Sequence, residues 1–207
     1  MRRLAILGAS GHGKVIADAA LLSNEWDKVE FFDDAHPDIK FVETWSVIGN
    51  TNDLIMQANQ FQGVVVAIGS NDIRLCKQRY LSQSGCQITS IVHPSAIVSP
   101  RSTIHQGTVV MAGAVINPFS VIGEACIINT NSVIEHDCIL SSGVHISPGC
   151  LLAGSVSVGS GSWIGIGASV KQLISICNNV IVGAGAIVVK NIKEQGTYVG
   201  NPARKLF

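Results

Sequence analysis

The chain has 207 residues with a formal net charge of zero, and only 14% of its residues are charged. Such a charge-poor chain argues against nucleic acid as a partner, because nucleic acids are bound by clustered lysine and arginine. No apolar run approaches the ~18 residues that a membrane-spanning helix needs, so no membrane span is expected.

The chain begins MRRLAILGASGHGK, in which the apolar run is four residues long before glycines follow. This is too short for a signal peptide, so a cytoplasmic location is expected. Apolar runs then alternate with helical patterns, which indicates a small parallel sheet with helices. The predicted strands cover 4–7, 29–32 and 64–69, and the predicted helices cover 14–22, 53–59 and 72–81. Thr51 or Asn52 is expected to cap the second helix and Asn71 the third.

These elements predict a Rossmann-like βαβ domain over residues 1–88, with a second domain over residues 89–207. A glycine-rich turn, GASGHG, follows the first strand, with glycines at positions 8, 11 and 13. It fits a dinucleotide fingerprint only loosely, but glycines let backbone N–H groups approach a phosphate at a helix N-terminus. The sequence therefore indicates an anion site here.

Asp33 and Asp34 end the second predicted strand. The carboxyl ends of parallel strands line the ligand crevice, where an acidic pair can hydrogen-bond a base or a ribose. A solvated turn is the plainer interpretation of this pair. An NAD site is disfavoured, because the domain is short and the rest of the chain offers no hydride chemistry.

The second domain carries an aliphatic residue at every sixth position from Val98 to Val188, sixteen positions without a miss. A period of six fits neither a helix nor a simple strand, but it fits a solenoid with three short faces per 18-residue coil. The run holds about five such coils. One residue of each face is expected to point inward and to stack on its equivalent in the next coil.

Small residues stand two places before most of these aliphatic positions, as a tight interior corner requires. They are Ala96, Ser102, Thr108, Ala114, Ser120, Cys126, Ser132, Cys138, Cys150, Ser162, Ala168 and Ala186. The six cysteines form no CxxC pair and no Cys/His metal spacing, so reduced, buried fillers are expected. Gly123, Gly159, Gly165 and Gly183 directly follow aliphatic positions, where a positive φ is expected.

His136 is the best candidate for a general base, because it stands between Glu135 and Asp137 and a neighbouring carboxylate orients an imidazole and raises its basicity. His145 follows half a coil later. A structural role is the ordinary interpretation of a lone histidine. A three-histidine zinc site with His105 is excluded, because the three residues differ in hexad phase and cannot stack.

The hexads, together with the segments GASGHG, FFDD, AIGSN, IVHPSA, SVIEHDC, HISPG and GNPAR in this order, resemble the sialic-acid-type hexapeptide-repeat sugar acyltransferases. Within that family the chain is most similar to the N-acetyltransferases of nucleotide-linked 4-amino-4,6-dideoxy sugars. The resemblance extends over essentially the whole chain. It implies an α/β Rossmann-like domain followed by a left-handed parallel β-helix, assembled as a homotrimer.

The resemblance also implies the roles of individual residues. His136 would be the general base, tuned by Asp137. The acceptor would be a UDP- or dTDP-linked amino sugar, and the donor acetyl-CoA, with no metal. The implied acceptor contacts are Ser10, Gly11, His12, Asp33, Asp34 and Gly69, and the implied acetyl-CoA contacts are His145, Ile166, Ala184 and Gly185. Relatives often have glycine at the position of Ala184, and some have glutamate at that of Asp137.

Two alternatives stay open at this point. One is an O-acetyltransferase acting on sialic acid or a related sugar, which would share the solenoid but would not need a phosphate-binding turn. The other is a solenoid without enzymatic activity, against which the acidic neighbours of His136 argue. The sequence leaves undecided the nucleotide carrier, the position of the amine, the length of the acyl group, the oxyanion donor and the glycan pathway.

Overall fold

The computed structural model describes residues 1–206, which divide into two compact units, the first covering Met1–Pro94 and the second beginning at Ser95. The predicted boundary after residue 88 stays a prediction. The first unit contains β1 (Arg3–Leu7), α1 (Gly11–Leu22), β2 (Lys28–Phe32), β3 (Phe41–Val42), β4 (Trp45–Ser46), α2 (Thr51–Met56), a 3-10 helix (Ala58–Gln60), β5 (Gly63–Val66), α3 (Asn71–Gln83) and β6 (Ile91–Val92).

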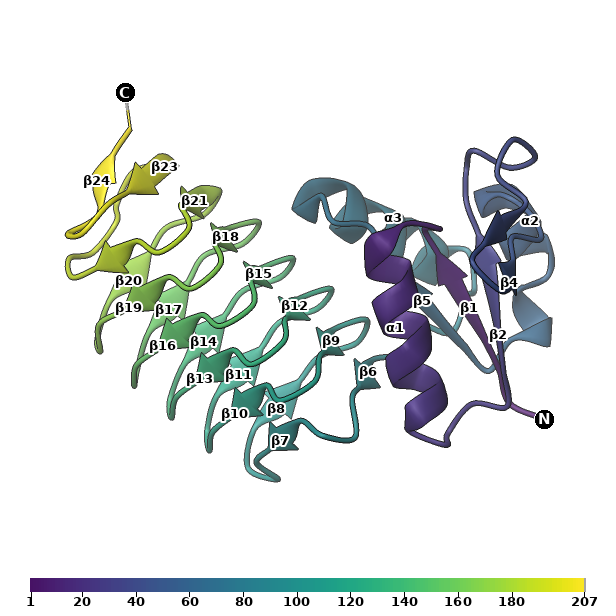
Figure 1. Cartoon of the computed structure of the whole chain (residues 1–207), viewed down its shortest axis with the longest axis horizontal. Coiled ribbons are helices and arrows are strands. Elements are labelled where there is room, and N and C mark those ends of the chain that lie inside the picture. Colours follow the sequence, from purple (N-terminus) through teal and green to yellow (C-terminus); the bar gives the residue numbers. More distant parts are fainter. Residues whose placement is uncertain (207) are drawn as a thin grey trace. The chain divides into compact units, whose positions relative to one another are not determined.

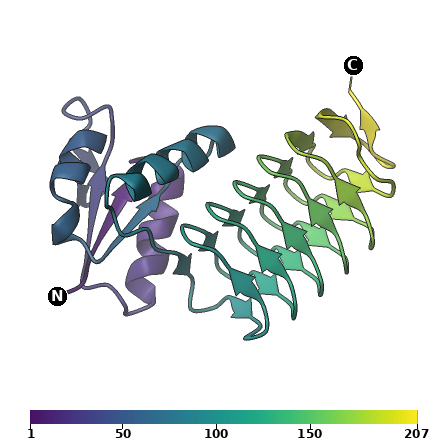
Figure 2. The ribbon, with the colours of Figure 1, turned by 180° about the vertical axis from the view of Figure 1, so that it is seen from behind.

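The first unit is built on a parallel three-stranded sheet with strand order β2-β1-β5. Figures 1 and 2 show α1 on one face of this sheet and α3 on the other. Leu4, Ala5 and Ile6 of the central strand are fully buried. The predicted Rossmann-like α/β arrangement is therefore confirmed. The central strand is apolar throughout, because both of its faces are covered by helices.

The helix starts differ from the prediction. Helix α1 begins at Gly11 rather than at residue 14. The cap of α2 is Asn50, whose side chain accepts hydrogen bonds from the N–H groups of Asn52 and Asp53, while the Asp53 carboxylate accepts from the Asn50 N–H. Asn71 is the first residue of α3 rather than its cap, because its side-chain oxygen accepts from Arg74 instead.

The second unit is a parallel β-solenoid whose strands form three separate sheets (Figure 1). We call them the first, second and third faces. The first face contains β7 (Ile97–Val98), β10 (Val115–Ile116), β13 (Val133–Ile134), β16 (Leu151–Leu152), β19 (Ser169–Val170) and β22 (Ile187–Val188). The second face contains β8 (Thr103–Ile104), β11 (Val121–Ile122), β14 (Ile139–Leu140), β17 (Ser157–Val158) and β20 (Ser175–Ile176).

The third face contains β9 (Val109–Val110), β12 (Ile127–Ile128), β15 (His145–Ile146), β18 (Trp163–Ile164), β21 (Val180–Val182), β23 (Gly196–Val199) and β24 (Arg204–Lys205). Strands β23 and β24 pair antiparallel and close this sheet. In the regular coils each residue pairs with the residue 18 positions later, as Ile116 does with Ile134. The six strands of the first face mark the start of a sixth coil beyond the five predicted.

The hexad residues form the solenoid core, as predicted. Fourteen of the sixteen, from Val110 to Val188, are at most 2% exposed, and only Val98 and Ile104 are partly buried. The small residues of the interior corners also have a polar function. Cys150 Sγ donates to the Gly165 carbonyl at 2.9 Å, as Ser120 Oγ donates to Glu135 at 2.7 Å. Burial raises the pKa of the Cys150 thiol, so the donating proton is kept.

The four glycines expected at positive φ occupy another conformation. They are required because neighbouring backbone lies too close for a side chain: a Cβ on Gly165 would lie 2.5 Å from the Val182 carbonyl oxygen. The left-handed positions fall two residues further along each turn, at Gly167 and Gly185 among others. Within residues 1–206 no helix is long and apolar enough to span a membrane.

Candidate active site

His136 lies on the turn between β13 and β14, the corner that joins the first and second faces. Its Nδ1 is 2.8 Å from Asp137 Oδ2, and both side chains are more than half exposed. Asp137 has φ 60°, a left-handed conformation that recurs at this position of the turn one coil later, at Ser155 with φ 58°. A neutral imidazole that donates from Nδ1 to this carboxylate keeps a lone pair on Nε2, which can accept a proton.

Gly154 makes room for the His136 ring. It occupies the equivalent corner one coil later, where a Cβ would lie 2.6 Å from both Cε1 and Nε2 of His136. Contacts of that length do not occur, so any side chain at this position would displace the imidazole. The chain also ties the two corners together, since Ser155 N–H donates to the His136 carbonyl at 2.9 Å. The sequence analysis missed Gly154, which a search for glycine 18 residues after a candidate base would have found.

A hollow of about 420 Å³ lies on the third face and contains three of the four residues predicted to contact acetyl-CoA, which are His145, Ile166 and Ala184. The fourth, Gly185, follows Ala184 in the same turn with φ 66°. The lining is largely apolar, from Trp163, Ile181, Val182 and Pro148 among others. A hollow of this size and character suits an uncharged arm of a small ligand. We call it the third-face hollow.

His145 is held between two partners. Its Nε2 lies 3.3 Å from Asn129 Nδ2, and its ring stacks on that of Trp163 with centroids 5.2 Å apart and planes 8° apart. Trp163 is fixed in turn, because its indole N–H donates to Ser147 Oγ at 2.7 Å. Trp163 is a second residue that the sequence analysis missed. It stands 18 residues after His145, so the coil period would have placed it in contact.

His136 and the third-face hollow do not meet within one chain. The corner between the first and second faces lies opposite the third face, and the buried aliphatic core fills the space between them. The structure therefore separates the predicted base from the predicted donor contacts, and brings together only the residues within each group.

The glycine turn in the first unit is tightly packed. Gly8 has φ 118°, and a Cβ there would lie 2.8 Å from the Ala67 carbonyl oxygen. Ser10 occupies the N-cap position of α1 without a side-chain cap bond. Asp33 supports the turn, since its carboxylate accepts from the Ala9 N–H at 2.7 Å. Burial, reinforced by the positive charge of Arg74, lowers the pKa of His12 to about 4, so its imidazole is neutral at pH 7.

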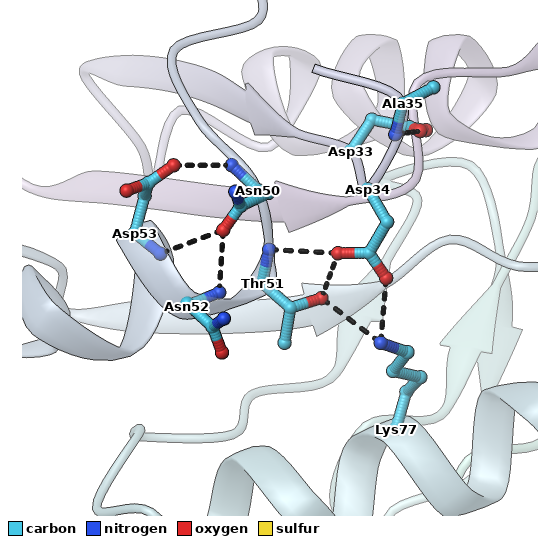
Figure 3. Close-up of polar contacts among 8 residues, drawn as sticks. All are labelled: Asp33, Asp34, Ala35, Asn50, Thr51, Asn52, Asp53 and Lys77. Atoms are coloured by element: carbon cyan, nitrogen blue, oxygen red, sulfur yellow. Dashed lines mark hydrogen bonds and ion pairs between the residues drawn. The ribbon is translucent and has the colours of Figure 1, made fainter. Parts of the chain in front are cut away.

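Asp34 is the centre of a network shown in Figure 3. Its Oδ1 accepts from the N–H and the hydroxyl of Thr51 at 2.9 and 2.6 Å, and its Oδ2 pairs with Lys77 Nζ at 2.7 Å. Burial would by itself raise the pKa of this carboxyl, but the hydrogen bonds from Lys77 and Thr51 outweigh it and lower the pKa to about 2. Asp34 is therefore ionised at neutral pH and ties the end of β2 to α2 and α3.

Within residues 1–206 no group of three or more His, Cys, Asp and Glu side chains is placed to hold a metal ion. The arrangement offers instead an oriented imidazole on one corner of the solenoid, an apolar hollow on the opposite face, and a turn with backbone donors in the first unit.

Comparison with known proteins gives one family match and several structural matches. A family described as the PglD N-terminal domain matches residues 3–81. The acetyltransferase domain of PglB from Neisseria gonorrhoeae FA1090, in complex with acetyl coenzyme A, is 39% identical over 99% of each chain, with a TM-score of 0.95.

Two further structures cover nearly the whole chain. A variant of perosamine N-acetyltransferase from Caulobacter crescentus, in complex with CoA and GDP-perosamine, is 36% identical over 99% of this chain and 96% of its own, with a TM-score of 0.94. WeeI from Acinetobacter baumannii AYE is 25% identical over the full length of both chains, with a TM-score of 0.84. The predicted resemblance is thereby confirmed at the level of the fold and of the family.

Proposed function

Since the chain belongs to the family of hexapeptide-repeat sugar acetyltransferases that use acetyl-CoA, we propose that it acetylates the amine of a nucleotide-linked 4-amino-4,6-dideoxy sugar. The observation that carries the proposal is the His136–Asp137 pair, seated over Gly154. It supplies a general base at the position where the family resemblance implies one. Acetyl-CoA and nucleotide sugars are intracellular metabolites, so we propose that the enzyme acts in the cytoplasm, in the synthesis of a bacterial glycan.

In the proposed reaction, acetyl-CoA supplies the acetyl group as a thioester. The unprotonated sugar amine forms the new C–N bond to the acetyl carbonyl carbon, and His136 Nε2 accepts the proton that the amine loses. Asp137 holds the ring in the required tautomer and stabilises the imidazolium. As the C–S bond breaks, the proton passes from Nε2 to the CoA sulfur. General-base catalysis of this kind contributes a factor of about 10²–10⁴.

The first unit is proposed to bind the nucleotide part of the acceptor. Backbone N–H groups of the Ser10, Gly11 and His12 segment lie at the N-terminus of α1, where an anion is stabilised by the helix dipole. Because His12 is neutral at pH 7, it offers the phosphate a hydrogen bond rather than a charge. Asp34 is ionised and accepts from a ribose hydroxyl or a base N–H, and Gly69 lies at the same end of the sheet.

The donor is proposed to occupy the third-face hollow, with His145 near the thioester and Ile166, Ala184 and Gly185 along the pantetheine arm. The apolar lining fits this uncharged arm. Since His136 lies on the opposite corner of its own solenoid, the base that serves this donor must come from a neighbouring copy. We propose a homotrimer whose active sites each combine the His136 corner of one copy with the third-face hollow of the next.

A panel assay tests the proposal. Purified protein is incubated with acetyl-CoA and, separately, UDP-, dTDP- and GDP-linked 4-amino-4,6-dideoxy sugars and free sialic acid. Products are detected by mass, because exposed free cysteines such as Cys76 would react with a thiol dye. Acetylation of one nucleotide amino sugar, lost in the His136→Ala variant, is expected. Turnover of sialic acid only would favour the O-acetyltransferase instead, and turnover of none would refute both.

A further inference from the structure

Arg74 is a buried cation of the first unit that the sequence analysis did not single out. It lies on α3 and is 1% exposed. Its Nη1 donates to the carbonyl oxygens of Ile68 and Gly69 at 2.9 and 3.1 Å, and its Nη2 donates to Asn71 Oδ1 at 2.8 Å. One guanidinium therefore holds three acceptors of the AIGSN segment, which joins β5 to α3. We call this segment, residues 67–71, the β5–α3 turn.

The β5–α3 turn is packed directly against the glycine turn. Gly8 approaches it so closely that a Cβ would lie 2.8 Å from the Ala67 carbonyl oxygen and 3.3 Å from Ile68 Cγ1. Around Gly69, in contrast, a Cβ would meet nothing within 4 Å, so this residue faces open space. The position of Gly69 is fixed by the hydrogen bonds that Arg74 donates to the carbonyl oxygens of Ile68 and Gly69 and to the side chain of Asn71.

Arg74 also acts on the glycine turn electrostatically. Its positive charge is the second cause, after burial, that lowers the pKa of His12 to about 4. The side chain thus contacts one of the two proposed nucleotide-binding turns and influences a residue of the other. Both turns lie at the carboxyl ends of adjacent parallel strands, β1 and β5, where ligands of such sheets bind.

We infer that Arg74 is a positioning residue of the acceptor site, which holds the β5–α3 turn in the shape that receives the nucleotide without touching the nucleotide itself. This inference rests on the proposed function, since it takes the acceptor to bind in the first unit. A planar guanidinium can reach two carbonyls and an amide oxygen at once, whereas a lysine ammonium is a single point donor. Arg74→Lys therefore keeps the charge but loses part of the support of the turn.

The test measures binding of UDP, dTDP and GDP by calorimetry, with acetyl-CoA as a second ligand, in the full-length protein. For whichever nucleotide the wild type binds, we expect Arg74→Lys to raise Kd by roughly tenfold, as expected for one or two lost hydrogen bonds. The Kd for acetyl-CoA should not change. Arg79→Lys, an exposed arginine on the same helix, is the matched control and should leave both values unchanged.

A second measurement separates the effect of the positive charge of Arg74 from its effect on the shape of the β5–α3 turn. In Arg74→Met the pKa of His12, followed by NMR, should rise, because the nearby positive charge is gone, whereas in Arg74→Lys it should stay low. Should Arg74→Lys fail to fold, Asn71→Ala removes the acceptor of Nη2 while leaving Arg74 in place, and it should raise the nucleotide Kd about two- to fivefold.

Two results would overturn the inference. The first is unchanged nucleotide binding in Arg74→Lys, or in Asn71→Ala where that variant has to replace it. The second is a wild-type protein that binds none of the three nucleotides. Failure of the proposed function is a different observation, namely that no nucleotide-linked amino sugar is acetylated while nucleotide binding and its dependence on Arg74 persist.

Discussion

Subunit complementation is the most direct consequence of the separation between His136 and the third-face hollow. His136→Ala removes the base. Ala184→Trp fills part of the hollow of about 420 Å³, and the substitution is tolerated because Ala184 is exposed. Each variant by itself should be inactive, yet each keeps the half of the site that the other lacks. If a site is shared between copies, a mixed assembly recovers activity.

The size of the recovery follows from counting interfaces. In a cyclic trimer each interface needs an intact base from one copy and an intact hollow from the next. Random mixing of equal amounts leaves both intact in about a quarter of the interfaces. A purified mixed trimer of either composition has one intact interface of three, so it should show about a third of the wild-type rate.

The assay co-expresses the two variants with different affinity tags, purifies the assemblies that carry both tags, and verifies their composition by native mass spectrometry. Acetylated product is then measured by mass. The control pairs His136→Ala with His136→Gln, which share the same defect and should recover nothing. A verified mixed assembly without activity would refute the shared site, as would a protein that is monomeric and active.

Three further outcomes are expected. Gly154→Ala should lower kcat roughly 10- to 100-fold and leave the nucleotide Kd unchanged, because the new methyl group displaces the His136 ring. A variant that keeps the wild-type kcat would contradict the proposal that Gly154 makes room for this ring. Lys77→Met should cost about 1 kcal/mol of unfolding free energy at pH 7, a value discounted for the half-exposed Asp34 carboxylate. The pKa of Asp34 is lowered from 3.8 to about 2, so the stability that the ion pair contributes is complete above pH 3.8 and is lost as the pH falls towards 2. Denaturant titrations in which Lys77→Met loses the same unfolding free energy at pH 7 and at pH 2.5 would argue against the ion pair. Cys150→Ala should destabilise by about 1 kcal/mol through the lost bond to the Gly165 carbonyl, and Cys150→Ser by less, since a hydroxyl donates equally well; thermal unfolding of the two variants measures the difference.

The solenoid could be predicted because its determinants repeat along the chain. Each aliphatic residue of the series packs on its equivalent 18 positions away, so the pattern in the sequence is also the pattern of contacts. The same regularity accounts for the small corner residues. It misled at Gly123, Gly159, Gly165 and Gly183, because a glycine after a strand can serve either a positive φ or a close approach of neighbouring backbone, and only the next coil distinguishes the two.

The residues predicted for the site are placed in groups that no linear pattern could separate. The spacing of His136 and His145 indicates that they are half a coil apart. Only the arrangement of the three faces shows that His136 lies on a corner and His145 on the opposite face. Trp163 and Gly154 acquire their roles from the residues 18 positions before them, His145 and His136. Their roles are visible once the coil length is combined with side-chain direction.

The sequence by itself determined the class of each unit, the coil length, the candidate base and the resemblance to sugar acetyltransferases, because these depend on local patterns and short motifs. Only the tertiary structure decided what supports the site. Arg74 and Lys77 appear in the sequence as ordinary charges on a helix, and their contacts run to the β5–α3 turn and to Asp34, up to 43 residues away. Burial and charge pairing are properties of the packed chain, since they depend on which segments fold against each other.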